Sequence, residues 1–326
     1  MAVLKKIAVL TSGGDAPGMN AAIRAVVRRA IKEDIKVVGV MRGYDGLVKG
    51  DFVPLLSKSV SSIIQLGGTI LKTARSKEFM TPEGRQIAYN NLVENEIDAL
   101  VVIGGDGTFK GARIFTEEFN FPTVGIPGTI DNDLFGTDMT IGYDTALNTV
   151  VEAVDKIRDT AASHERVFLI EVMGRDAGFI ALRAGIACGA EDVLIPETPS
   201  DLEGLHEKLT RYIDTKKTSS VILVAEGDEE GGAFEIKEKM SKFKGDYELR
   251  VTVLGHIQRG GSPSAYDRYL ASRLGIGAVE ALIDDQRSIM IGMINREVVH
   301  VPFNKTTKHH KTIDQKMVDI VEILNA

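Results

Sequence analysis

The chain has 326 residues, of which 44% are hydrophobic and 26% are charged, a balance typical of a globular protein. This length predicts two domains or one large α/β unit, because single cores stop growing near roughly 250–300 residues. The formal net charge of −7 argues against a nucleic-acid partner, which needs a basic face, although a few focused cations can still bind phosphate.

The single cysteine, Cys188, rules out an intrachain disulfide and favours a reducing compartment. Gly13 and Gly14 interrupt the apolar run near the N-terminus, which is therefore shorter than the about 7–15 residues of a signal-peptide core. No stretch reaches the roughly 18 apolar residues of a membrane span. We therefore expect a cytoplasmic protein that has no membrane partner.

Short apolar runs recur along the chain and predict buried parallel strands, because they lack alternating polar residues. These runs are Ile7–Leu10, Val37–Met41, Ala99–Ile103, Val124–Ile126, Val167–Met173, Val221–Ala225 and Val251–Leu254. Residues 23–31 and 147–157 carry apolar stripes at helical spacing, and a further helix is expected to start at Ser200, with Glu203 in the capping-box position. The alternation predicts an α/β fold with mostly parallel sheets.

The first glycine-rich turn, LTSGGDAPG over residues 10–18, joins a predicted strand to a predicted helix. Glycines let backbone N–H groups approach a phosphate, and the helix N-terminus adds partial positive charge. The segment lacks the Gly-Lys-Ser/Thr of a Walker A loop, and a tight turn without a ligand explains it equally well.

The second turn is VVIGGDGT over residues 101–108, and the helix after it is expected to start near Thr108. Asp106 stands among three glycines and suits a Mg²⁺ ion on a nucleotide phosphate, held directly or through water. A purely structural turn is the alternative. GGDGT also occurs in NAD kinases and diacylglycerol-type lipid kinases, so this motif indicates a kinase without indicating its substrate.

The third segment is GIPGTIDND over residues 125–133. In an extended backbone Asp131 and Asp133 would point to the same side. Phosphoryl transfer to an alcohol needs one group to accept the hydroxyl proton and another to arrange the metal. An Asp/Asn-rich turn would explain the composition, but not why phosphate-suited turns recur at three successive strand ends.

A set of cationic side chains completes the candidates. Arginine binds phosphate in a bidentate manner, and several of these residues follow predicted strands, although each alone would more often be a solvated surface residue. The set is Arg75, Arg166, Arg175, Arg250, His256 and Arg259.

The motifs TSGGDAPGMNAAIR, VVIGGDGT, PGTIDND, VMGR and TVLGHIQRGGSP resemble the bacterial-type ATP-dependent 6-phosphofructokinases in order and spacing, over nearly the whole chain. The resemblance implies two Rossmann-like three-layer α/β domains with mostly parallel sheets and an active site in the cleft between them. Residues 1–140 plus 257–302 would form the ATP-binding domain. Residues 141–256 plus 303–326 would form the fructose 6-phosphate-binding domain.

The implied reaction is ATP-dependent phosphorylation of fructose 6-phosphate at its 1-hydroxyl, the committed step of glycolysis. Asp131 resembles the catalytic base, with Thr129 beside it and Asp133 assisting the metal. Arg75 and Arg175 would meet the charge that develops on the transferred phosphoryl group. Further ATP-site residues would be Gly14, Ser76, Gly105, Gly107 and Thr108, with Asp106 on Mg²⁺.

The resemblance also places the sugar phosphate. Besides Thr129, Asp131 and Arg175, the residues implied to bind fructose 6-phosphate are Met173, Gly174, Glu226, His256 and Arg259. Arg166 and Arg250 would reach it from a neighbouring subunit of a homotetramer. Pyrophosphate-using relatives carry Asp where this chain has Gly107 and Lys where it has Gly128, so ATP is the expected donor.

An effector site between subunits is also implied, with ADP or phosphoenolpyruvate as its ligand. Its matching residues are Arg24, Arg28, Arg158 and Lys217. Cations common elsewhere in the family are replaced by Ser57, Thr215, Thr218 and Ser219, so we expect weakened allosteric control. Ser76 likewise replaces a common aromatic residue. The alternatives are a pyrophosphate-dependent enzyme and a catalytically silent, ligand-binding homologue.

Overall fold

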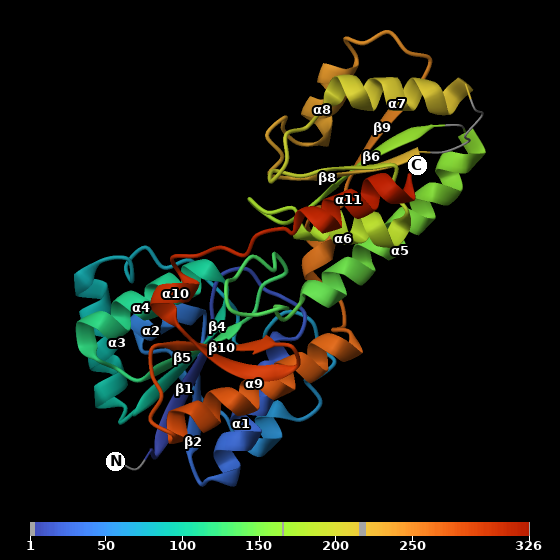
Figure 1. Cartoon of the computed structure of the whole chain (residues 1–326). Coiled ribbons are helices and arrows are strands. Elements are labelled where there is room, and N and C mark those ends of the chain that lie inside the picture. Colours follow the sequence, from blue (N-terminus) through green and yellow to red (C-terminus); the bar gives the residue numbers. More distant parts are fainter. Residues whose placement is uncertain (1–3, 165, 215–219, 326) are drawn as a thin grey trace. The chain divides into compact units, whose positions relative to one another are not determined.

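The chain is described from a computed structural model over residues 4–164, 166–214 and 220–325 (Figure 1). It divides into two compact units. Unit 1 contains the chain up to Ile130, Leu134–Thr145 and Arg259–Lys311. Unit 2 contains Asp131–Asp133, Ala146–Gln258 and the chain from Thr312.

The described residues of unit 1 form a seven-stranded sheet in the order β11-β10-β5-β4-β1-β2-β3. The β10–β11 and β2–β3 pairs are antiparallel, and the other neighbours are parallel. The strands are β1 Lys6–Thr11, β2 Lys36–Val40, β3 Phe52–Pro54, β4 Ala99–Gly104, β5 Thr123–Pro127, β10 Ile289–Ile294 and β11 Glu297–Pro302.

Helices cover both faces of this sheet. Helices α1 and α9 pack together on one face, and α2, α3, α4 and α10 lie on the other (Figure 1). Their bounds are α1 Met19–Lys32, α2 Gly43–Lys49, α3 Pro82–Glu94, α4 Asp106–Phe119, α9 Ala265–Ile283 and α10 Phe303–Thr306, with short 3₁₀ turns η1 Ser57–Val60 and η2 Gly255–Arg259. Helix α5, Tyr143–His164, begins in unit 1 and continues into unit 2.

Unit 2 carries a parallel sheet of four described strands in the order β7-β8-β6-β9. Helices α5, α6 and α11 lie on one of its faces, and α7 and α8 on the other (Figure 1). The elements are β6 Val167–Val172, α6 Phe179–Cys188, β7 Asp192–Leu194, α7 Leu202–Asp214, β8 Ser220–Ala225, α8 Ala233–Met240, β9 Leu249–Val253 and α11 Gln315–Leu324. The prediction of an α/β fold with mostly parallel sheets is confirmed.

All seven strands predicted from apolar runs are present, whereas the short strands β3 and β7 and the β10–β11 hairpin were missed. The hairpin turns through the two residues Asn295 and Arg296. Both have left-handed φ values, 50° and 69°, as a type I′ hairpin requires. In the described ranges no helix is both long enough and apolar enough to cross a membrane.

Two helix starts differ from the predictions. Helix α7 begins at Leu202, and its first turn is capped by Asp201, whose Oδ1 accepts a 2.9 Å hydrogen bond from the Gly204 N–H. Ser200 donates to Asp228 at 2.8 Å instead, so it is not the cap. Helix α4 begins at Asp106 rather than near Thr108, because the Thr108 N–H already bonds the Gly105 carbonyl at 3.0 Å.

Residues 303–311, which the sequence placed with the second domain, pack with unit 1. Phe303 is buried, and its ring centroid lies 5.6 Å from that of Phe109 in α4. This aromatic contact keeps the segment after β11 on the first sheet.

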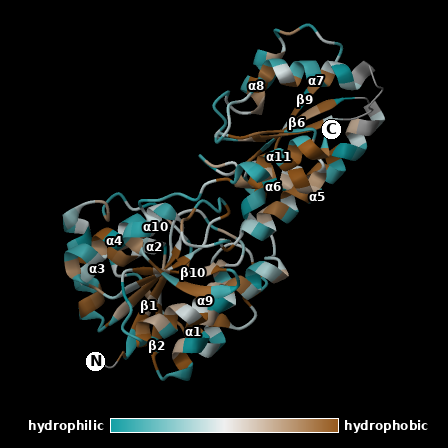
Figure 2. Ribbon diagram, in the orientation of Figure 1, coloured by the Kyte–Doolittle hydropathy of each residue, from teal (hydrophilic) through white to brown (hydrophobic). Residues whose placement is uncertain are grey.

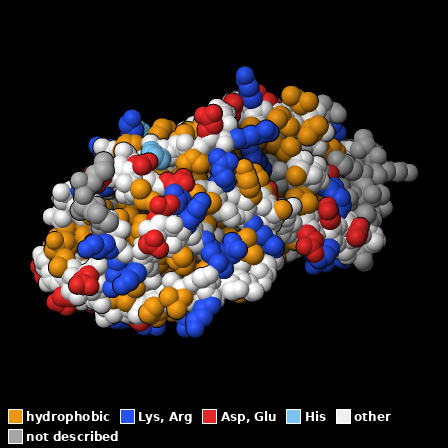
Figure 3. Space-filling model, turned by 90° about the horizontal axis from the view of Figure 1, so that it is seen from below, with side chains coloured by type: hydrophobic (Ala, Val, Ile, Leu, Met, Phe, Trp, Pro, Cys, Tyr) orange, Lys and Arg blue, Asp and Glu red, His pale blue; other side chains and the backbone are white. Residues whose placement is uncertain are grey.

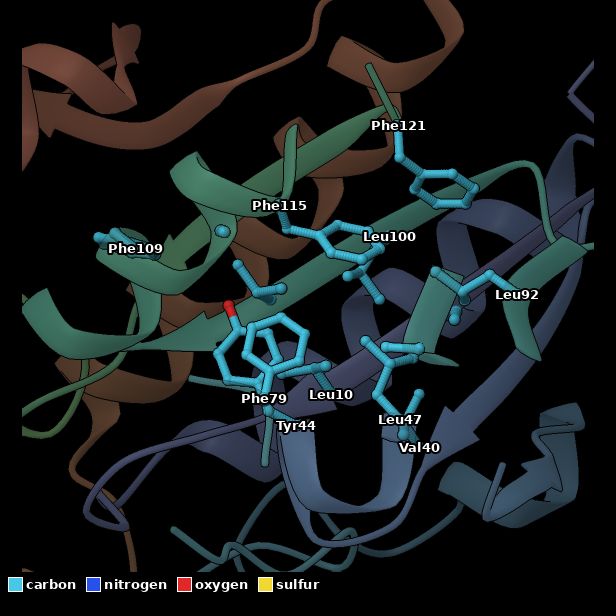
Figure 4. Close-up of a cluster of buried hydrophobic side chains, with 14 of the residues drawn as sticks. Leu10, Val40, Tyr44, Leu47, Phe79, Leu92, Leu100, Phe109, Phe115 and Phe121 are labelled. Carbon is cyan, nitrogen blue, oxygen red and sulfur yellow. The ribbon is translucent and has the colours of Figure 1, made fainter. Parts of the chain in front are cut away.

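Each unit has its own apolar core, and Figure 2 shows the hydrophobic residues gathered on the strands of both sheets. In unit 1 the core between the sheet and helices α2–α4 is rich in aromatic rings (Figure 4). Tyr44 and Phe79 stack there with centroids 4.1 Å apart. On the face drawn in Figure 3, basic and acidic side chains are interspersed with apolar ones.

Asp267, in the first turn of α9, is fully buried. Its carboxylate accepts hydrogen bonds from the Gly142 N–H at 2.8 Å, the Thr145 N–H at 2.8 Å and the Thr145 hydroxyl at 2.5 Å. It therefore fixes the start of α5 to α9. Burial raises the pKa of Asp267 to about 6, although the hydrogen bonds from Thr145 and Gly142 act in the opposite direction.

Asp267 should make the stability of the fold depend on pH. Because its folded-state pKa lies above its ordinary value, its contribution is complete below about pH 4 and is lost as the pH rises through about 6. The difference in unfolding free energy between wild type and Asp267→Asn should therefore shrink by up to about 3 kcal/mol between pH 4 and pH 7. Chemical denaturation across this range measures it. The exposed Asp246→Asn is the control, and a pH-independent difference would contradict the assignment.

Candidate active site

The three glycine-rich turns meet at the carboxyl edge of the unit 1 sheet. The Ser12 N–H, just after β1, bonds the Ile103 carbonyl in β4 at 2.9 Å. The Gly128 N–H, just after β5, bonds the Gly104 carbonyl at 3.0 Å. Since β4 lies between β1 and β5, these two bonds hold the ends of three adjacent strands in register, at the edge where open α/β sheets bind ligands.

The glycines at this edge differ in the space that a Cβ atom would have. A Cβ on Gly104 would lie 2.3 Å from Thr108 Oγ1 and 2.5 Å from the Ser12 carbonyl oxygen, so the fold itself excludes a side chain there. A Cβ on Gly128 would lie 3.0 Å from Ile103 Cγ2 and 3.2 Å from Met19 Cε, which is tight. A Cβ on Gly107 would meet nothing within 4 Å. The packing of the chain therefore does not explain Gly107.

Two polar atoms at the start of α4 have no hydrogen-bond partner in the described part of the chain. They are Asp106 Oδ1 and Thr108 Oγ1, and both are buried. The other carboxylate oxygen of Asp106 pairs with Lys110 Nζ at 2.6 Å. The Thr108 carbonyl accepts a 2.6 Å hydrogen bond from the buried Tyr44 hydroxyl, which fixes this first helical turn. An unsatisfied buried acceptor is costly, so both atoms are candidates for contact with a ligand or its bound water.

These residues fit a Mg²⁺ ion that arrives with a nucleotide. Mg²⁺ keeps several waters and usually takes one or two protein carboxylates together with substrate phosphates. Asp106 Oδ1 is a carboxylate oxygen of this kind. Among the described residues no group of three or more His, Cys, Asp or Glu side chains is arranged to hold a metal, so a cage built only from protein is not indicated.

The other predicted ATP-site residues also lie in unit 1. Arg259, which was predicted to bind the sugar phosphate, lies in unit 1 as well, and its guanidinium packs against the first glycine turn, since a Cβ on Gly14 would lie 3.0 Å from its Nη1. The Arg75 side chain is exposed. Ser76 Oγ accepts a 3.2 Å hydrogen bond from the Phe79 N–H, so this serine shapes the loop that carries Arg75.

The segment of the predicted base does not continue the strand. Asn132 has a φ of 55°, in the left-handed region, so the expectation that Asp131 and Asp133 share one side of an extended backbone is wrong. Asp131 is only 6% exposed. The Thr129 carbonyl accepts a 2.6 Å hydrogen bond from the Thr140 hydroxyl, which ties the turn to the segment before α5. Thr129 belongs to unit 1, whereas Asp131–Asp133 group with unit 2.

The predicted sugar-phosphate residues of unit 2 form two groups. In the first, Glu248 pairs with both Arg166, at 2.7 Å, and Arg250. The hydrogen bond from Arg166 holds the pKa of the Glu248 carboxyl below its ordinary value. One exposed carboxylate therefore joins the two arginines that the resemblance assigned to the same sugar phosphate. The parallel β6–β9 register, which pairs Val167 with Leu249 and Phe168 with Arg250, brings the two segments side by side.

The second group surrounds the turn after β6. Glu226 Oε1 accepts hydrogen bonds from the Gly174 N–H at 3.2 Å and the Arg175 N–H at 2.8 Å. Met173 is buried, whereas the Arg175 side chain is exposed. His256 is exposed in η2. The structure thus assembles the predicted residues into a unit 1 set and a unit 2 set, and the active site between the domains stays a prediction.

Comparison of the sequence with known proteins identifies the family to which the chain belongs. The family model described as Phosphofructokinase matches residues 6–282. The chain belongs to the phosphofructokinase family. It is 57% identical over 325 residues to an "ATP-dependent 6-phosphofructokinase 2" of Bacteroides thetaiotaomicron, with 100% of each chain covered.

Solved phosphofructokinase structures share the fold. That of Saccharomyces cerevisiae superposes with a TM-score of 0.89 at 38% identity, covering 98% of this chain and 47% of that chain. This chain therefore spans about half the length of the yeast chain. A pyrophosphate-dependent phosphofructokinase of Marinobacter aquaeolei has a TM-score of 0.84 at 21% identity, covering 99% of this chain and 92% of that one, and this likeness concerns the fold alone.

Two of the candidate effector residues of this phosphofructokinase, Arg28 and Arg158, have partners within the chain. Arg28 Nη1 donates to Ser57 Oγ at 2.6 Å. Arg158 donates to the carbonyls of Cys188 and Gly189, each at 3.0 Å, and lies 3.5 Å from Glu191. Arg24 is half-buried in α1. Lys217, Thr215, Thr218 and Ser219 lie outside the described residues.

Sequence reasoning missed four residues that organise the site of this family member. Tyr44 and Lys110 contact Thr108 and Asp106, Glu248 joins two arginines, and Gln258 bonds the Met173 N–H at 3.3 Å. The position of Lys110 four residues after Asp106 on a helix was a usable signal. The contacts of Tyr44 with Thr108, of Glu248 with Arg166 and of Gln258 with Met173 span long sequence separations, which no local pattern reveals.

The contrast between two glycines can be tested without a ligand. Gly104→Ala should lower the unfolding free energy by about 1–3 kcal/mol, because its methyl group overlaps the Ser12 carbonyl and the Thr108 hydroxyl. Gly107→Ala should leave it unchanged or raise it by about 0.5 kcal/mol, since the methyl group enters open space in a helix. Melting temperatures of the two variants measure this. Equal losses would show that Gly107 is also a packing glycine.

Proposed function

We propose that this chain is an ATP-dependent 6-phosphofructokinase, which transfers the γ-phosphoryl group of MgATP to the 1-hydroxyl of fructose 6-phosphate and releases fructose 1,6-bisphosphate and ADP. The observation that carries the proposal is the 57% identity over the whole chain to a relative named for this activity. The unpartnered acceptors at the start of α4 support it, because they suit a hydrated metal on a nucleotide.

Asp131 acts as the base in this mechanism. Its carboxylate accepts the proton of the sugar 1-hydroxyl while the oxygen–phosphorus bond forms and the bond between the γ-phosphorus and the β-phosphate oxygen breaks. The low exposure of Asp131 and the Thr140 hydrogen bond on Thr129 support a fixed geometry. Arg75 and Arg175 stabilise the charge on the transferred phosphoryl group, an effect that usually supplies the largest share of catalysis.

The phosphates of ATP bind the backbone of Gly14, Gly105, Gly107 and Thr108, with Ser76 near the nucleoside. Mg²⁺, when bound, neutralises phosphate charge and aligns the reacting oxygens. Asp106 would hold this ion through Oδ1, directly or by way of water, and Asp133 would assist. Met173, Gly174, Glu226, His256 and Arg259 bind the sugar phosphate.

The choice of ATP over pyrophosphate rests on Gly107 and Gly128. Gly107 is exposed, and its open surroundings leave room for an α-phosphate that an Asp side chain would occupy. Gly128 lies against Ile103 and Met19, so a lysine there would require Met19 to move. Both features support a site adapted to a nucleotide.

The working enzyme is proposed to be a cytoplasmic homotetramer in which Arg166 and Arg250 reach the sugar phosphate of a neighbouring subunit. Glu248, which pairs with both arginines, would keep them side by side until the phosphate arrives. Unit 1, with residues 303–311, would bind ATP, and unit 2 would bind the sugar phosphate. Neither ligand class requires a nucleic acid or a membrane.

The decisive experiment measures fructose 1,6-bisphosphate formation with Mg²⁺ and either ATP or pyrophosphate. Turnover is expected with ATP alone, and Asp131→Ser should lower kcat by about 10³-fold or more, because the proton then has no acceptor. Turnover with pyrophosphate would overturn the Gly107 and Gly128 argument. Silence with both donors, in folded protein that still binds the sugar phosphate, would favour the regulatory homologue.

Allosteric control is proposed to be weak. Ser57, Thr215, Thr218 and Ser219 stand where cations are common in the family, so fewer cations are available to bind an anionic effector. The Arg28 and Arg158 guanidinium groups also donate to Ser57 and to the backbone carbonyls after α6. ADP at low fructose 6-phosphate should change the rate less than about twofold, and phosphoenolpyruvate should inhibit equally weakly. Initial rates against effector concentration measure this. Strong activation by ADP would contradict the proposal.

A further inference from the structure

The turn Met173–Gly174–Arg175, directly after β6, has an unusual backbone. Gly174 has a φ of 152° and Arg175 a φ of 55°, a left-handed conformation that non-glycine residues adopt rarely. The Ala177 N–H bonds the Gly174 carbonyl at 3.1 Å and closes the turn. Such conformations persist only where their surroundings over-determine them.

Two side chains from distant segments accept hydrogen bonds from the three backbone N–H groups of this turn. Gln258 Oε1 accepts from the Met173 N–H at 3.3 Å. Glu226 Oε1 accepts from the Gly174 N–H at 3.2 Å and from the Arg175 N–H at 2.8 Å. These N–H groups are therefore occupied, and the turn presents side chains rather than backbone donors to a ligand.

Both side chains are themselves fixed. Gln258 is fully buried, and its Nε2 donates to the Gly255 carbonyl at 3.0 Å, so one carboxamide joins the turn to the segment that carries His256. The Glu226 N–H bonds the Val172 carbonyl at 3.0 Å. A Cβ on Gly227 would lie 2.1 Å from the Arg175 carbonyl oxygen, so the backbone after Glu226 presses directly on the turn.

We propose that Gln258 and Glu226 are positioning residues that lock the Met173–Arg175 turn and thereby aim the exposed Arg175 side chain. What Arg175 is aimed at, the transferred phosphoryl group, rests on the proposed function. Gln258 acts only through the backbone. Oε1 of Glu226 accepts the two backbone hydrogen bonds, and Oε2 is the atom that would contact the sugar.

The carboxamide at 258 is suited to this role because it offers one acceptor and one donor. The reverse orientation of the amide would set its NH₂ against the Met173 N–H and its oxygen against the Gly255 carbonyl. Glutamate at this position would keep the acceptor for Met173 but bring two oxygens together at Gly255. Methionine would fill a similar volume and supply neither group.

Gln258→Met is therefore the main test, read by hydrogen–deuterium exchange of the peptide that contains residues 172–177. Exchange at Met173 should become about tenfold faster, because a hydrogen bond is lost. Ile222→Val, in the core of β8, is the control for a general loss of stability, and it should leave the exchange of this turn unchanged relative to the rest of unit 2. Unchanged exchange in Gln258→Met would overturn the proposal.

Glu226 gives a second, independent comparison. Glu226→Gln keeps an oxygen that can accept both N–H groups, so protection of Gly174 and Arg175 should be retained, whereas Glu226→Ala should lose it. Loss in both variants would show that the charge, not the hydrogen bonds, holds the turn, and would overturn this part of the proposal.

Kinetics then connects the turn to the reaction. Gln258→Met should lower kcat about 10- to 100-fold and change KM for fructose 6-phosphate less than threefold, because a misdirected Arg175 acts on the transition state. Faster exchange with an unchanged kcat would overturn the positioning role. An inactive wild-type chain that shows the expected exchange pattern would leave the lock standing and refute the proposed function instead.

Discussion

The close approach of backbone to backbone at the carboxyl ends of β1, β4 and β5 is the constraint on which the unit 1 site depends. Gly104 lies so near the Ser12 carbonyl and the Thr108 hydroxyl that no Cβ fits. Because these strand ends are held in register, the three glycine-rich turns open at one edge, and α4 starts directly beside them. The buried acceptors of Asp106 and Thr108 follow from this arrangement.

Several charged candidate residues of this protein, whose net charge is −7, are paired within the chain. Lys110 covers Asp106, and Glu248 covers Arg166 and Arg250. Each pair is at least partly exposed, so its net stabilisation is small and a phosphate competes with it at little cost. These pairs hold Lys110, Arg166 and Arg250 in place and still allow them to bind an anion.

Two of the described non-glycine residues with left-handed backbone lie among the candidate residues. Asn132 and Arg175 are non-glycine residues with left-handed φ values, and each lies in or beside a residue set that the sequence marked for catalysis. Strain of this kind is stored at functional sites when neighbours enforce it, as Glu226 and Gln258 do around Arg175. The left-handed backbone of Asn132, a residue type that tolerates this region better than most, makes the extended backbone expected at Asp131–Asp133 wrong.

The sequence by itself determined the α/β class, seven of the strands and the candidate turns, because continuous apolar runs and glycine clusters are local signals. It also carried the family, since five motifs recur in order along the chain. Only the tertiary structure decided that Gly104 is a packing glycine and Gly107 is not, and that residues 303–311 stay with unit 1. It also decided that Glu248 pairs with Arg166 and that Gln258 bonds the Met173 N–H. Gln258 and Met173 are 85 residues apart in the chain, and their contact exists only because β6 and β9 pair side by side. Contacts of this kind depend on which segments fold together, and that information is absent from any short stretch of sequence.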